Sequence, residues 1–164
     1  MVQWVAAGVV LPTWAATAQA QMALSAAINV SGSFRALSQR MAKAYCQQHL
    51  QVMPLAALDV LAKVRKQAQA GAADLAKGST AGAWPADLSR QLEEVQKQYT
   101  VLNTLTATAP SKASAAAVAE QADRMMTAAQ TATESLEKLA RAPRAKLVNL
   151  AGRQRMLSQR MAKN

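Results

Sequence analysis

Two stretches of the chain repeat the same glycine, arginine, serine and glutamine residues at helical spacing. Residues 28–43 read INVSGSFRALSQRMAK and residues 148–163 read VNLAGRQRMLSQRMAK, and ten of the sixteen positions are identical. A guanidinium carries a planar fork of N–H donors that binds two oxygens of one anion, so the repeated arginines are suited to an anionic partner. The repeat therefore indicates helices that could bind an anion.

The repeated residues fall on two faces of a helix. On a wheel of 100° per residue, Val30, Leu37 and Met41 share an apolar face, whereas Gly32 and Arg35 lie on the opposite side. Glycine inside a helix costs about 1 kcal/mol relative to alanine, so a glycine kept in both copies predicts the close approach of another helix. We expect the first face to enter the bundle core and the second to meet something polar or anionic. The alternative is a recent duplication with solvated arginines.

The charge of the chain is concentrated at the same places. The net charge of the 164 residues is +10, and residues 138–164 carry eight basic and no acidic side chains. Residues 1–58 carry three basic and no acidic side chains, and the middle is nearly balanced. With one histidine, His49, and one cysteine, Cys46, a His- or Cys-based catalytic or zinc site is not expected. We predict neither enzymatic activity nor a cofactor nor a metal.

The N-terminus resembles an export signal. An apolar run from Trp4 to Trp14 precedes the small residues Ala18-Gln19-Ala20, which are typical of a cleavage site, and Gln21 would then begin the mature chain. A basic n-region is missing, because the first arginine is Arg35. We predict a signal peptide over residues 1–21 and a periplasmic protein, associated with the membrane only if this segment is retained. The alternative is an apolar helix that packs on the domain.

The remaining sequence predicts an all-α fold. Helical apolar stripes separated by Pro54, a Gly/Ser loop at 78–82, Pro110 and Pro143 predict an antiparallel up-down four-helix bundle over residues 22–142. Because the repeat offset of 120 residues matches the size of such a bundle, residues 143–164 are predicted to be the first helix of a second, truncated repeat. The alternative is a fifth helix of the first bundle.

The motif Gly152-Arg153-Gln154-Arg155-Met156-Leu157-Ser158-Gln159-Arg160-Met161, with its first copy around Gly32 and Arg35, resembles the PilJ-type N-terminal domain of methyl-accepting transducers. It is also similar to the P-box helix of NarX-type nitrate/nitrite sensors. The resemblance implies a periplasmic sensor bundle that dimerises through its first helix and holds a small oxyanion with one arginine per subunit. The implied ligand-binding residues are Arg35, Arg155, Gly32, Gly152, Ser38, Ser158, Arg40 and Arg160.

Two functions from different classes follow. The first is a sensory domain that binds a small anion such as nitrate or nitrite, as a homodimer or with a partner receptor. The second is a helical protein–protein interaction module with no small ligand. The few aromatic residues and the export signal argue against nucleic-acid binding.

Overall fold

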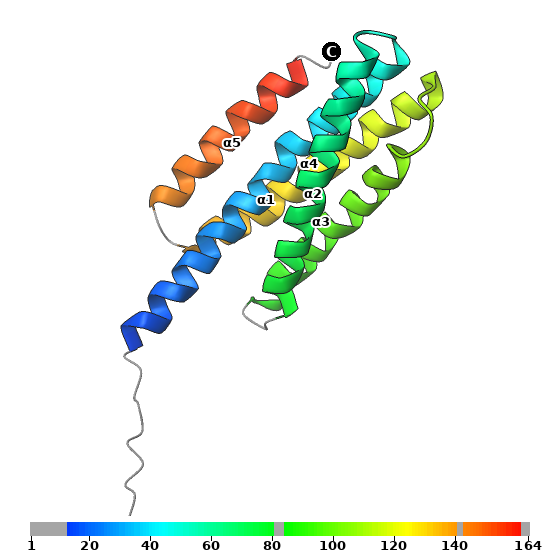
Figure 1. Cartoon of the computed structure of the whole chain (residues 1–164). Helices are drawn as coiled ribbons and strands as arrows, with labels where there is room; N and C mark the ends of the chain where they lie inside the picture. The colour runs from blue at the N-terminus through cyan, green and yellow to red at the C-terminus, as the bar shows by residue number, and fades with distance from the viewer. Residues whose placement is uncertain (1–12, 81–83, 141–142, 162–164) are drawn as a thin grey trace, which may run out of the picture.

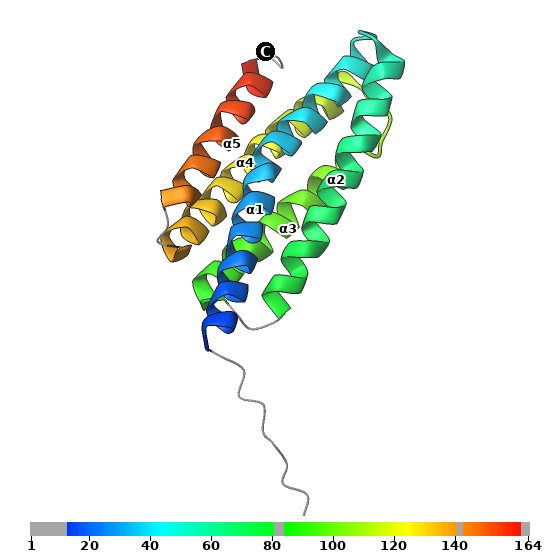
Figure 2. The ribbon, with the colours of Figure 1, turned by 60° about the vertical axis from the view of Figure 1, so that its left-hand side comes forward.

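The computed structural model of the chain describes residues 13–80, 84–140 and 143–161, and within these stretches all regular structure is helical. The helices are α1 (Thr13–His49), α2 (Pro54–Thr80), α3 (Ala86–Leu105), α4 (Lys112–Ala140) and α5 (Pro143–Met161). Helices α1 to α4 lie alongside one another with alternating direction, and α5 runs parallel to α1 on the outside of the bundle (Figures 1 and 2). The predicted all-α bundle is confirmed.

The core consists of the apolar stripes that the sequence predicts. The predicted stripe of α3 is buried at Leu88, Leu92, Val95, Tyr99 and Leu102, and its last member, Leu105, is partly buried. From α1, Phe34 and Met41 are completely buried, and the Phe34 ring meets the Tyr99 ring at 6.0 Å between centroids. Removing such side chains from water drives the packing of the amphipathic helices, at roughly 25 cal/mol per Å² of apolar surface.

The helix ends follow local chemistry. Ser111 and Ser114 form a reciprocal cap at the start of α4: Ser114 N donates to Ser111 Oγ (3.1 Å) and Ser111 N donates to Ser114 Oγ (2.8 Å). Pro54 and Pro143 open α2 and α5, where the missing N–H is no loss. The turn between α1 and α2 uses left-handed backbone at Gln51 and Met53.

Two predicted boundaries differ from the structure. The loop expected at 78–82 begins later, because residues 78–80 complete the last turn of α2. Helix α1 begins at Thr13, inside the predicted signal peptide, whereas residues 1–12 with most of the apolar run lie outside the described residues. Among the described residues, no helix is both long enough and apolar enough to span a membrane.

Helix α1 has neighbours on more than one side, which corrects the expected division of its faces. It packs against α2, α4 and α5, so side chains opposite the apolar stripe are also covered. Polar residues of α1 are therefore buried, among them Ser31, Arg35, Ser38 and Gln39. The face expected to meet something polar or anionic is packed against α4 and α5 of the same chain.

Candidate functional site

Arg35 is the centre of a buried polar cluster between α1, α4 and α5. Its side chain is only 1% exposed, the largest of the fully buried side chains. Nε donates to the carbonyl oxygen of Gly32 at 3.1 Å, and Nη1 donates to Gln130 Oε1 of α4 at 2.6 Å. Nη1 also donates to Asn149 Oδ1 of α5, and Nη2 lies 3.5 Å from the Asn149 carbonyl oxygen. All of these acceptors are neutral.

Helix α5 meets α1 in the register of the repeat. A Cβ added to Gly32 would lie 3.0 Å from Arg35 Nη2, and a Cβ added to the equivalent Gly152 would overlap the same nitrogen. Both glycines thus border one guanidinium, and the two helices run in the same direction (Figure 2). The close helix approach that the repeated glycine predicts is present, and its partner is the second copy of the motif.

Two glutamates of α4 set the electrostatics of the cluster. Asn149 Nδ2 donates to Glu137 Oε2 at 2.8 Å, and Arg153 forms an ion pair with Glu134 at 2.6 Å. Burial lowers the pKa of Arg35, and the negative charge of Glu137 opposes this shift. Burial raises the pKa of Glu137, although its hydrogen bond to Asn149 and the charge of Arg35 oppose the rise. Among the described residues, no ion pair joins Arg35 directly to a glutamate.

The second arginine of the repeat, Arg155, lies on another side of the α1–α5 pair. Arg155 is exposed and lines a cavity between α1, α2 and α5, together with Arg40 and Asn29. Asn29 is the repeat equivalent of Asn149, so each motif arginine lies near the motif asparagine of the other helix. The two arginines nevertheless do not share a site, since α4 covers Arg35 and α2 borders Arg155.

The other predicted residues divide in the same way. Ser38 is buried, and its hydroxyl donates to the carbonyl oxygen of Arg35 at 3.0 Å. Ser158 repeats this bond to Arg155 at 2.8 Å, but it is exposed, as is Arg160. Of the predicted ligand-binding residues, Gly32 and Gly152 therefore lie beside the Arg35 guanidinium, and Ser38 bonds to the Arg35 backbone. Arg40 lies instead in the cavity with Arg155.

Sequence reasoning did not select the polar partners of Arg35. Asn149 had a signal, because Asn29 and Asn149 are identical in the two copies. Gln130 and Glu137 lie on α4 outside the repeat, and no pattern in the sequence marks them as partners of Arg35. Their role depends on which helix faces Arg35, and that is settled only by the packing of α4 on α1.

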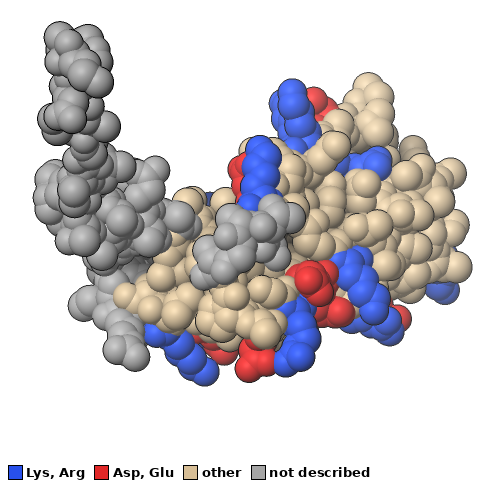
Figure 3. Space-filling model, turned by 90° about the horizontal axis from the view of Figure 1, so that it is seen from below, with Lys and Arg blue, Asp and Glu red and all other residues tan. Residues whose placement is uncertain are grey.

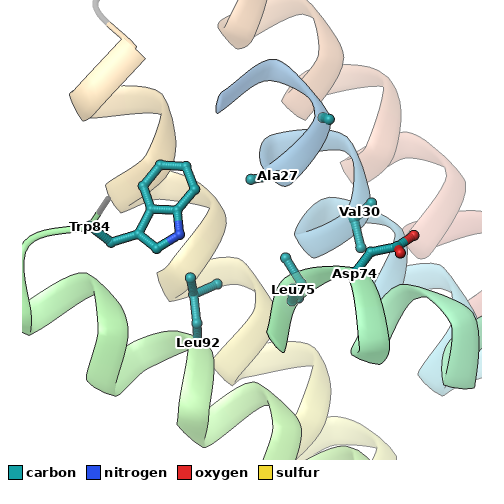
Figure 4. A pocket seen from close by; sticks show the side chains of 7 residues that line it. Ala27, Val30, Asp74, Leu75, Trp84 and Leu92 are labelled. Atoms are coloured by element: carbon teal, nitrogen blue, oxygen red, sulfur yellow. The ribbon is translucent and has the colours of Figure 1, made fainter. Parts of the chain in front are cut away.

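A separate apolar pocket of about 250 Å³ lies beside Trp84, between α1, α2 and α3 (Figure 4). Ala27, Leu75 and Leu92 line it, and the Asp74 carboxylate points away from the indole ring (Figure 4). The indole Nε1 is buried without a hydrogen-bond partner in the described part of the chain. Most of the residues that line this pocket are apolar, as in an ordinary hydrophobic core.

The fold and the Arg35 cluster define an all-helical bundle built around a buried polar centre. The family model of the type IV pili methyl-accepting chemotaxis transducer N-terminal domain, PilJ, matches residues 16–125. Because this match covers more than half of the chain, the chain belongs to the PilJ N-terminal domain family, which supports a sensory domain. No curated protein and no solved structure matches the chain.

Proposed function

We propose that this sensory domain is periplasmic and binds a small oxyanion, such as nitrate or nitrite, through Arg35. The observation that carries the proposal is the set of neutral acceptors around a completely buried guanidinium. A hydrogen bond between neutral groups contributes about 0.5–1.5 kcal/mol, and one to a charged group about 1.5–3 kcal/mol. An anion that replaces neutral acceptors would therefore bind Arg35 more strongly, with both oxygens on one planar fork.

Anion binding would be linked to the position of α5. Asn149 uses its side-chain and backbone oxygens on Arg35, and Gly152 closes the space beside Nη2. An oxyanion on the same nitrogens displaces Asn149 and so favours a state in which α5 has moved. A ligand shifts such an equilibrium by its difference in affinity for the two states. This coupling gives the domain a physical means of signalling.

The test is a thermal-shift screen of the whole chain with sodium nitrate, nitrite and other oxyanions, with sodium chloride of equal ionic strength as the reference. We expect an oxyanion to raise Tm and Arg35→Ala to abolish the rise. Arg124→Gln removes an exposed arginine of α4 and should keep it. Circular dichroism checks that Arg35→Ala is folded. A screen in which no oxyanion raises Tm would refute the proposal.

A protein–protein interaction module without a small ligand is the second candidate. The observation in its favour is the in-register packing of the two motif helices around Gly32 and Gly152. A motif that pairs with itself inside the chain would also pair with another copy. Under this function, Gly32→Leu changes the oligomeric state in light scattering, whereas Arg35→Ala does not.

The face of the molecule seen in Figure 3 gives no support to nucleic-acid binding. On the face seen in Figure 3, acidic side chains lie beside the basic ones, without an extended patch of one sign. Several of these charges form short-range helical pairs, such as Arg124 with Glu120 and Arg90 with Asp87. Nonspecific binding to phosphate backbones depends on a concentrated positive surface.

A further inference from the structure

The cavity beside Arg155 carries a binding inference of its own. It has a volume of about 370 Å³ and is bordered by residues of α1, α2 and α5. Apolar side chains such as Val30 and Leu37 form part of its wall. The polar residues that line it are Asn29, Ser33, Arg40, Gln67, Asp74 and Arg155.

Within the part of the chain that the structure describes, the side chains of the two arginines of this cavity lack protein partners. Within the described residues, neither Arg40 nor Arg155 has a side-chain hydrogen bond or an ion pair, whereas Arg35 has acceptors from both α4 and α5. On the Arg35 side, α4 supplies an amide oxygen and nearby carboxylates. On the Arg155 side, α2 contributes Gln67 and Asp74 to the cavity lining, but within the described residues neither forms a hydrogen bond or ion pair with Arg40 or Arg155. The two arginines therefore leave the cavity with an excess of positive charge.

The cavity also holds groups suited to a cation. Asp74 contributes a carboxylate to the lining. Its Oδ1 forms a long, solvent-exposed ion pair with Lys77 Nζ, at 3.6 Å. The Ser33 hydroxyl donates its proton to the carbonyl oxygen of Val30 at 2.7 Å, so its lone pairs remain free to accept. Two arginines and one aspartate give the lining a net charge of +1.

The cavity is larger than the smallest anions need. A water molecule takes about 30 Å³ in the liquid, so a volume of 370 Å³ holds roughly ten groups of that size. A nitrate ion fills only a small part of it. A small organic molecule with several polar groups matches the volume better.

We infer that the cavity between α1, α2 and α5 binds an acidic α-amino acid. Its two carboxylates pair with Arg40 and Arg155, and its ammonium group pairs with Asp74 and Ser33. The ligand charge of −1 then balances the +1 of the lining. This site is separate from Arg35 and goes beyond the proposed oxyanion function.

Isothermal titration calorimetry of the whole chain with L-glutamate tests the inference, with glutarate and sodium nitrate as comparison probes. Glutarate keeps both carboxylates and lacks the ammonium group. A hydrogen bond to a charged group contributes about 1.5–3 kcal/mol, so Arg155→Gln should weaken glutamate binding by about ten- to hundredfold. Arg124→Gln, which removes a distant surface arginine, should leave it unchanged.

Asp74→Asn separates recognition of the ammonium group from general anion binding. It should weaken L-glutamate by about tenfold or more, whereas glutarate, which lacks the ammonium group, should lose no affinity because a repelling carboxylate is removed. No glutamate heat, or glutamate binding that is indifferent to Arg155→Gln, would overturn the inference. Equal binding of glutarate and glutamate to the native chain would overturn it too. Because nitrate is tested through Arg35→Ala, the two proposals can fail independently.

Discussion

Replacing Gly152 with alanine is expected to destabilise the chain, although alanine is the better helix former. The added Cβ would overlap Arg35 Nη2 and lie 3.3 Å from Arg35 Cζ. The guanidinium is the end of a flexible side chain, but it is buried and held by Gln130 and Asn149. It can make room only by giving up some of these hydrogen bonds.

The magnitude follows from two opposing terms. Alanine in place of glycine gains about 1 kcal/mol of helix propensity. Breaking one hydrogen bond of a buried charged group costs about 1.5–3 kcal/mol, so the net destabilisation should be about 0.5–2 kcal/mol. In a chain of this length each kcal/mol lowers Tm by about 2–4 °C, which gives a decrease of about 1–8 °C.

Thermal and urea unfolding followed by circular dichroism measure the effect, and the Arg35→Ala background supplies the control. Without the guanidinium the clash is gone, so Gly152→Ala should become stabilising by up to about 1 kcal/mol. The sign therefore reverses between the two backgrounds. A higher Tm for Gly152→Ala in the native background, or the same effect in both, would refute the packing of Gly152 on Arg35.

Two further predictions concern buried polar groups. Burial raises the pKa of Glu137 above its ordinary value of 4.5. The folded state therefore binds the carboxyl proton of Glu137 more tightly than the unfolded chain does. The free energy of unfolding consequently falls as the pH rises from 4.5 through the pKa of the folded state. Glu137→Gln should flatten this fall and stabilise the neutral-pH protein, and an unchanged pH slope of the urea midpoint would contradict it. Tyr45→Phe should cost about 1–2 kcal/mol, because the buried hydroxyl contacts the carbonyl oxygens of Thr108 and Ala109 at 3.2 Å. Tyr99→Phe is the matched control in the same urea titration and should be nearly neutral, because the buried Tyr99 side chain forms no hydrogen bond within the described residues.

The sequence predicts the helices well because each helix carries its own periodicity and its own end signals. The stripe from Leu88 to Leu102 and the breaks at Pro54 and Pro110 are local features, and the structure keeps them. A helical wheel, however, gives the faces of one helix and not the number of its neighbours. The burial of Arg35 could therefore not be predicted.

The two copies of the motif show the same limit. Their sequences make Arg35 and Arg155 equivalent, but one is buried and the other exposed. The difference arises from α4, which covers one side of the α1–α5 pair and not the other. Long-range packing, which no local pattern encodes, thus assigns different chemistry to identical residues.

The pairing of α1 with α5 has a consequence for assembly, because α5 is tethered. Helix α5 begins at Pro143, three residues after α4 ends at Ala140. A short tether holds a binding segment at an effective concentration in the millimolar range, so a motif helix from another copy competes poorly for α1 at lower protein concentrations. If the chain assembles through α1, as the second proposed function requires, assembly would depend less on how much protein is present than on whether α5 has been released, and a ligand that takes Arg35 from Asn149 would act on that step.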